Sequence, residues 1–174
     1  GNGGNGFQKR LLLLHQLAQK TDRYQLDESD ISLISTASAL HDIGKIMIPE
    51  EILNKPGRLT EEEYATIKTH TTEGARILKE LAIGQDEPLV KVAHAICRWH
   101  HERWDGGGYP DNLAGEAIPL GARIIAVADA WVALTTDRPH RAALGPAEAL
   151  AEIIRSAGAQ FDPAVVAALP DALR

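Results

Sequence analysis

The sequence predicts an all-α fold. Apolar residues recur every three or four positions through most of the chain, and helix-capping residues, prolines and glycines divide this pattern into segments. No stretch shows the alternating pattern of a convincing strand. The 174 residues, 44% of them hydrophobic, suit one domain with an ordinary buried core.

In the first half of the chain, helices are expected over residues 7–20 and 28–41, where leucine, isoleucine and alanine follow helical spacing. The stretch 41–58 contains glycines and prolines that predict short turns and loops. Thr60 and Glu63 form a capping-box pattern that opens a long helix to about Leu81. Asp86 is expected to cap a further helix that has Pro88 in its first turn and ends near Glu102.

The second half begins with a glycine-rich loop over residues 103–119, and loops this long inside a domain are usually functional. The apolar stretch 120–137 predicts a central core helix. Pro146 starts another helix that ends near Gly158, and Asp162 with the following proline starts the last one. Residues 1–6, "GNGGNG", have the composition of a flexible linker, or of an engineered chain end, ahead of one domain over residues 7–174.

Composition restricts the function. The formal charge of -6 argues against binding a nucleic-acid polymer, which usually needs a basic surface. A single cysteine, Cys97, cannot form an internal disulfide, and we interpret it as a core residue. No apolar run approaches the ~18 residues of a membrane segment, and no signal-peptide pattern is present. A cytoplasmic enzyme or binding module is therefore expected.

Histidines and aspartates recur at the ends and centres of the predicted helices. Asp129 lies in the middle of the apolar helix, where a carboxylate is costly to bury unless it pairs or binds a metal. A salt bridge to an arginine such as Arg123 is the structural alternative. Imidazole and carboxylate ligands without cysteine suit iron, manganese or zinc in a non-structural site. The candidate ligands are His41, Asp42, His70, His100, His101 and Asp129.

The adjacent histidines, His100 and His101, favour a centre with two metal ions over a centre with one. Neighbouring residues on a helix project about 100° apart, so His100 and His101 suit two nearby ions better than one. His41 could bind one ion while Asp42 bridges both with its two oxygens. Six ligands for two metals leave positions open for water and substrate, as a hydrolytic site requires.

Four segments carry a family resemblance: "HDIGK" at 41–45, "HHERWDGGGYP" at 100–110, "RIIAVADA" at 123–130 and "DRP" at 137–139. In this order they resemble the HD-GYP family, a branch of the HD-domain metal-dependent phosphohydrolases, from about Asp27 to Ala164. The resemblance implies an HD-domain helical bundle with the long glycine-rich loop at the metal site. It also implies hydrolysis of cyclic di-GMP to linear pGpG or GMP by a metal-activated hydroxide.

The resemblance assigns roles at matching positions. The six candidate ligands match the family's metal ligands, with Asp42 bridging. Lys45 would lie beside the reacting phosphate, so Asp42 and Lys45 are the expected catalytic residues. Gly107 and Tyr109 of the glycine-rich loop would contact the substrate. Arg138 and Arg141, matching residues that hold substrate phosphates, complete the expected substrate-binding set.

The chain departs from the family pattern at three places. The family usually has a histidine, and in trinuclear members a glutamate, early in the first helix, where this chain has neither. Val132 replaces a frequent second aspartate, and His140 with Arg141 replaces the usual tyrosine and lysine. We therefore expect two divalent ions, iron or manganese, and no third metal.

The sequence leaves three functional hypotheses open. The first is a cyclic di-GMP phosphodiesterase; the second is a degenerate HD-GYP module that binds nucleotide or a partner protein without turnover. The third is an HD hydrolase of another cyclic dinucleotide. By resemblance, the expected partner domain is an N-terminal receiver or sensor outside this chain. The oligomeric state is left open, with a homodimer as one alternative.

Overall fold

A computed structural model describes residues 3–81, 84, 86–138 and 141–174. Helices dominate these residues, and the pairings outside them are isolated bridges such as Asp105 with Ala114. The all-α prediction is confirmed. The helices are α1 (Gly3–Lys20), α2 (Glu28–Ser38), α3 (Glu50–Leu53), α4 (Glu61–Lys68), α5 (His70–Glu80), α6 (Pro88–Trp99), α7 (Leu120–Leu134), α8 (Pro146–Arg155) and α9 (Pro163–Ala172).

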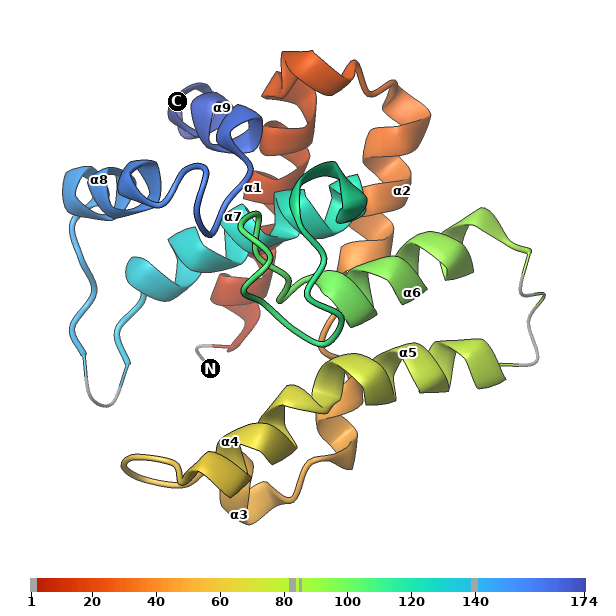
Figure 1. Cartoon of the computed structure of the whole chain (residues 1–174). Coiled ribbons are helices and arrows are strands. Elements are labelled where there is room, and N and C mark those ends of the chain that lie inside the picture. The colour runs from red at the N-terminus through yellow and green to blue at the C-terminus, as the bar shows by residue number, and fades with distance from the viewer. Residues whose placement is uncertain (1–2, 82–83, 85, 139–140) are drawn as a thin grey trace.

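Short 3-10 helices join some of these elements. They are η1 (Asp22–Tyr24), η2 (Ile43–Met47) and η3 (Gly115–Ala117). Helix α7 runs through the centre of the molecule between α1, α6, α8 and α9, as Figure 1 shows. Helices α3 and α4 form an arm below it, and α5 leads from this arm back along α6.

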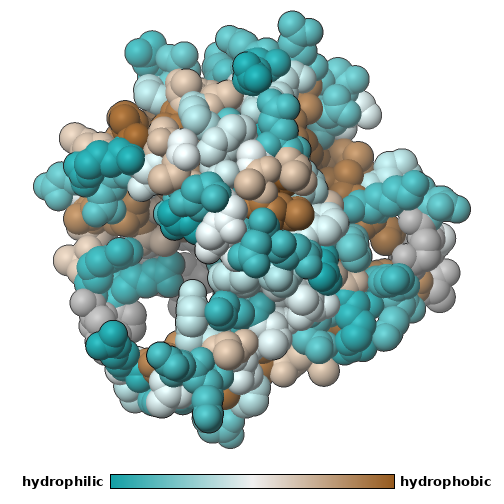
Figure 2. All heavy atoms as spheres, in the orientation of Figure 1, coloured by the Kyte–Doolittle hydropathy of each residue, from teal (hydrophilic) through white to brown (hydrophobic). Residues whose placement is uncertain are grey.

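The core surrounds α7. Ile124 and Ile125 of this helix are fully buried against Leu14 and Leu17 of α1 and Ile96 of α6. Burying side chains of this size removes apolar surface from water and stabilises each by about 1.5–3 kcal/mol. Hydrophilic residues cover most of the face shown in Figure 2. Within the described residues, every helix is too short or too polar to cross a bilayer.

Several expected boundaries are confirmed. Thr60 and Glu63 form the predicted capping box at α4, and the Asp162 side chain accepts a hydrogen bond from the Ala164 amide at the start of α9. Pro88 is in the first turn of α6, but the N-cap is Glu87, so the predicted cap at Asp86 is wrong. Helix α1 begins at Gly3, which makes residues 3–6 helical where a linker was expected; residues 1 and 2 lie outside the described part.

The helix expected over residues 60–81 is divided in two. Helix α4 ends at Lys68 and α5 begins at His70, with Thr69 between them. The hydroxyls of Thr66, Thr69 and Thr72 donate to backbone carbonyls three or four residues earlier. Such bonds compete with the helical ladder and bend helices. The break leaves His70 as the first residue of α5.

Other predicted helices are shorter than expected. The segments expected to end at residues 41, 102, 137 and 158 end as helices at Ser38, Trp99, Leu134 and Arg155. Because of the first two changes, His41 and His100 lie at or beyond helix ends rather than within helices. The rings of these two histidines meet edge to face, with their centroids 5.2 Å apart.

Candidate metal centre

The six candidate ligands come from four places in the fold. His41 and Asp42 lie between α2 and η2, His70 begins α5, His100 and His101 follow α6, and Asp129 lies in the middle of α7. His41, His70 and His100 are buried, while Asp42 and Asp129 are half-buried. The structure brings these residues, separate in sequence, into one cluster.

Asp42 lies at the centre of the cluster. Its Oδ2 is 3.1 Å from His41 Nε2 and 3.0 Å from Lys45 Nζ. Its Oδ1 is 3.6 Å from His70 Nε2 and 3.7 Å from His100 Nε2. One oxygen of this carboxylate therefore faces His41 and Lys45, and the other faces His70 and His100.

The histidines contact each other as well. The Nε2 atoms of His70 and His100 lie 3.4 Å apart, and the ring centroids of His100 and His101 are separated by 4.2 Å. Two groups of ligand atoms could each hold a metal ion: His70 with His100 and His101, and His41 with Asp42 and His100.

Backbone carbonyls orient three of these rings. The Nδ1 atoms of His41 and His70 lie 2.7 Å from the carbonyl oxygen three residues earlier, and that of His100 lies 2.8 Å from the one four residues earlier. A carbonyl only accepts, so each Nδ1 carries the hydrogen and Nε2 faces the cluster. Metal-binding histidines usually have this arrangement, because the second hydrogen bond fixes both tautomer and ring orientation.

Gly44 explains how the cluster is assembled. A Cβ atom at this position would lie 1.9 Å from the His70 carbonyl oxygen and 2.5 Å from the Gly74 amide nitrogen. Only a residue without a side chain allows η2 to approach the backbone of α5 this closely. The glycine of "HDIGK" thus brings Asp42 within reach of His70.

The cluster shifts the pKa values of its members in opposite directions. Burial disfavours the charged form of His41, but contacts with the Asp129 and Asp42 carboxylates outweigh it and raise the His41 pKa to about 9. Burial, reinforced by neighbouring histidines, lowers the pKa of His100 to about 4 and that of His101 to about 3. The latter two imidazoles are neutral at pH 7, the form that binds metal.

An unsatisfied buried atom of His41 is further evidence that the cluster suits a metal ion. His41 Nε2 is buried and makes no well-formed hydrogen bond to any residue that the structure describes, although two carboxylates are close. A buried polar atom without such a bond is costly, and an ion among imidazole and carboxylate ligands would satisfy it.

Asp129 contacts a histidine and an arginine, and that arginine is not Arg123. Its Oδ2 lies 3.3 Å from His41 Nε2, and its Oδ1 lies 2.5 Å from Arg10 Nε in α1. Arg123 instead forms a buried ion pair with Asp162, at 2.6 Å. The alternative of a salt bridge from Asp129 to an arginine is therefore confirmed, but the partner is Arg10 and not Arg123. The sequence contained no signal for Arg10, because nothing in the local pattern brings the first helix to α7.

The glycine-rich loop lies over the cluster and is held by a residue that the sequence analysis missed. The buried Glu102 side chain accepts hydrogen bonds from the amides of Asp111, at 2.7 Å, and Leu113, at 3.0 Å. Gly108 packs against the backbone of residues 101–103, where a Cβ would lie 2.5 Å from the Arg103 amide nitrogen. The Tyr109 ring stacks on His101 at 5.0 Å.

A cavity of about 570 Å³ opens beside the cluster. It is lined by His70 and His101 together with three of the expected substrate-binding residues, Lys45, Gly107 and Tyr109. Sequence reasoning missed its other polar residues. These are Tyr64, Arg103 and Gln160.

The remaining expected substrate-binding residues lie farther along the surface. A second cavity, beside Asp129, shares His101, Arg103 and Gln160 with the first. A third shares Gln160 with both and is lined by Arg141. The Arg141 guanidinium donates to the Ala133 carbonyl at 2.8 Å. Arg138 is exposed and pairs through its backbone with Arg141; His140 lies outside the described residues.

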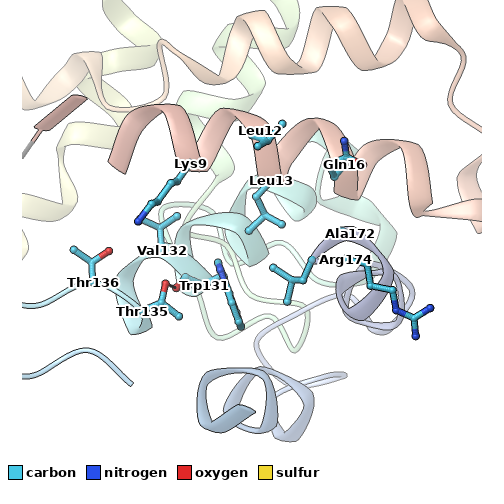
Figure 3. A pocket seen from close by; sticks show the side chains of 11 residues that line it. Lys9, Leu12, Leu13, Gln16, Trp131, Val132, Thr135, Thr136, Ala172 and Arg174 are labelled. Atoms are coloured by element: carbon cyan, nitrogen blue, oxygen red, sulfur yellow. Dashed lines mark hydrogen bonds between the residues drawn. The ribbon is translucent and has the colours of Figure 1, made fainter. Parts of the chain in front are cut away.

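Val132 belongs to a different surface. Together with Lys9 and Leu13 of α1, it lines a cavity between α1, α7 and α9, which Figure 3 shows. Its position, where the family often has an aspartate, is buried and apolar in this chain.

Comparisons with known proteins show the family to which the chain belongs. A family model described as HD domain matches residues 7–165. The cyclic di-GMP phosphodiesterase response regulator RpfG of Xanthomonas campestris is 43% identical over 167 residues, covering 96% of this chain and 43% of the relative. The 3′3′-cGAMP-specific phosphodiesterase 2 of Vibrio cholerae is 39% identical over 143 residues, 82% of this chain and 27% of the relative.

The solved structure of Bd1817, an HDG"Y"P protein from Bdellovibrio bacteriovorus, matches with a TM-score of 0.68 over 94% of this chain and 51% of that one. Its sequence identity is 22%, so it supports the fold alone. The chain spans less than half the length of the curated relatives it matches. With the motif order of its sequence and the match to the family model, the chain belongs to the HD domain family, in its HD-GYP branch.

Proposed function

We propose that this chain is a metal-dependent phosphodiesterase that hydrolyses cyclic di-GMP. The observation that supports this most strongly is the convergence of His41, Asp42, His70 and His100 beside a cavity lined by Lys45 and Tyr109. Cyclic di-GMP is named for the RpfG relative and is carried over here as a proposal.

The proposed centre holds two divalent ions, iron or manganese. Asp42 would contribute to holding both ions, because its two oxygens face different histidines. The ligands are His41, Asp42, His70, His100, His101 and Asp129. When bound, such ions supply an activated water at neutral pH and positive charge at the phosphate.

The chain's own residues would bind and orient the substrate. Lys45, 3.0 Å from Asp42 and half-exposed at the cavity, would donate to a phosphate oxygen or to the departing 3′ oxygen. Gly107 and Tyr109 line the same cavity, and the Tyr109 ring offers a stacking face for a guanine. Arg138 and Arg141 would hold the second phosphate, with Gln160 along the connecting surface.

A second candidate substrate is 3′3′-cGAMP. Relatives named as specific for it match this chain at 38% to 47% identity. Both molecules carry two phosphates in one ring, so the proposed phosphate contacts suit either. The preference for one substrate would therefore depend on the contacts with the purine bases.

The test uses purified protein loaded with manganese or iron without oxygen, with cyclic di-GMP and 3′3′-cGAMP supplied separately and products separated by chromatography. Faster cleavage of cyclic di-GMP is expected. Asp42→Asn should lower turnover by at least about a hundredfold, because a bridging ligand is lost.

His94→Asn is the matched control. This histidine lies in α6, ahead of His100, and its ring packs near Trp99 rather than in the cluster. Activity should be unchanged. A metal-loaded wild-type protein that binds cyclic dinucleotides without cleaving them would instead establish the non-hydrolytic module.

A further inference from the structure

A positive charge from the first helix lies at the edge of the candidate metal centre. Arg10 Nε contacts Asp129 Oδ1 at 2.5 Å, and both side chains are about a quarter exposed. Arg10 Nε and Asp129 Oδ1 are themselves buried atoms, and neither makes a well-formed hydrogen bond within the described residues, so their contact is an ion pair. This ion pair joins α1 to the middle of α7, beside the histidines.

The two oxygens of Asp129 have different kinds of partner. Oδ2 faces His41 Nε2 at 3.3 Å, and Oδ1 faces the guanidinium of Arg10. A guanidinium is a cation that only donates, so its contact with Oδ1 is an ion pair, and the packing of α1 on α7 fixes it in place. Arg10 therefore holds Oδ1 from α1, while Oδ2 stays directed at the histidine.

We propose that Arg10 is a resident cation of this centre, which occupies Asp129 Oδ1 and excludes a metal ion from that side. Asp129 is then left with one oxygen for the ions held by the histidines and Asp42. The inference rests on the proposed function, since it concerns the number and affinity of the ions in that site. A fixed positive charge this close also repels a divalent ion, the more so where water is excluded.

The chain offers a matched control in the same helix. Lys9 precedes Arg10 but points into the cavity between α1, α7 and α9, near Val132, as Figure 3 shows. Lys9→Gln removes one positive charge from α1 without touching Asp129. Arg10→Gln removes the charge at the centre, Arg10→Lys keeps a charge, and Arg10→Met preserves the aliphatic stem should the glutamine variant fail to fold.

In the experiment, each metal-free variant of the 174-residue chain is titrated with Mn²⁺ by calorimetry in the absence of oxygen. The ions that each variant retains after dialysis are then counted. Arg10→Gln and Arg10→Met should bind the weakest-held ion about tenfold more tightly than wild type, or retain an additional ion. Arg10→Lys should stay near wild type, and Lys9→Gln should match it. In an Asp129→Asn background, Arg10→Gln should have a smaller effect than in the wild type, because the contact with that carboxylate is already lost and only the charge repulsion remains to be relieved.

Each other outcome has a definite meaning. Equal titrations of wild type and Arg10→Gln would overturn the inference, and weaker binding by Arg10→Gln would make Arg10 a positioning residue for Asp129 instead. Binding by Arg10→Gln but not by wild type would support the inference while contradicting the proposed function. If neither binds Mn²⁺, with circular dichroism showing both folded, both proposals fail.

Discussion

His41 is the residue at which protons and metal ions compete most directly. Burial alone would lower its pKa, but the carboxylates of Asp129 and Asp42 reverse that effect and raise it to about 9. In the metal-free protein the imidazolium thus balances two carboxylates. His100 and His101, whose pKa values are lowered to about 4 and about 3, are already neutral at pH 7.

This difference predicts how metal affinity depends on pH. Because an ion must displace the proton of His41, affinity for Mn²⁺ should rise by about tenfold per pH unit from pH 7 to about 9 and then level off. Calorimetric titrations across this range, in buffers of different ionisation enthalpy, would measure about one proton released per chain below pH 9. An affinity that is flat between pH 7 and 9 would contradict the raised pKa.

The same shift affects the stability of the metal-free protein. The folded-state pKa of His41 lies above its unfolded value of 6.5, so the stabilisation is fully present below pH 6.5 and is lost as pH rises through about 9. His100 and His101 act in the opposite sense, because their lowered pKa values remove stability as pH falls below 6.5. The metal-free protein should therefore be most stable near pH 6.5, where the His41 contribution is still almost complete and the losses from His100 and His101 have just begun.

At the scale of elements, the site depends on close approach between η2 and α5. Gly44 lies where a Cβ would overlap the backbone at His70 and Gly74, and Asp42 and Lys45 flank it. The threonine-rich break between α4 and α5 then sets where α5 starts. Packing of two short elements, rather than any single ligand, positions the central carboxylate.

Replacing Gly44 with alanine should therefore damage both stability and metal binding. The added Cβ meets backbone atoms that cannot move aside, so we expect a loss of roughly 3 kcal/mol or more in the free energy of unfolding. Urea denaturation and Mn²⁺ content measure the two effects. Gly145→Ala is the control: its Cβ would meet no atom within 4 Å, and a cost of about 1 kcal/mol or less is expected at this N-cap. Equal losses in both variants would contradict the steric argument.

At the scale of the molecule, a buried ion pair joins segments far apart in sequence. Arg123 of α7 contacts Asp162 at the start of α9, and the Tyr24 hydroxyl of η1 donates to the same carboxylate oxygen at 2.6 Å. The arginine is 8% exposed and the aspartate 1%. The pair holds the ends of the bundle together around α7, away from the metal ligands.

Asp162→Asn should destabilise the protein by about 3–5 kcal/mol, because it leaves the Arg123 charge buried without a counter-charge. Metal stoichiometry of the folded fraction should stay the same, since the pair does not contact the cluster. Arg76→Ala, which breaks exposed pairs with Glu73 and Glu80, should cost no more than about 1 kcal/mol. Denaturant midpoints of the three proteins test this, and similar midpoints for both variants would contradict it.

The fold class could be predicted because helical periodicity is a local property. The capping box at Thr60, the cap at Asp162 and the central apolar helix were all readable in the sequence. Helix ends were less predictable. Threonine side chains that bond to the backbone, as at Thr69, compete with the helix by an energy too small to read from pattern alone.

By itself, the sequence determined that the chain is helical and where its glycine-rich loop lies, and it predicted six side chains suited to a metal, because spacing and residue chemistry are carried by the chain locally. Only the tertiary structure decided which charged side chains form ion pairs with each other. It paired Asp129 with Arg10 rather than Arg123, and it placed Val132 in a separate cavity. Partners distant in sequence are chosen by how helices pack, and packing depends on the whole core at once.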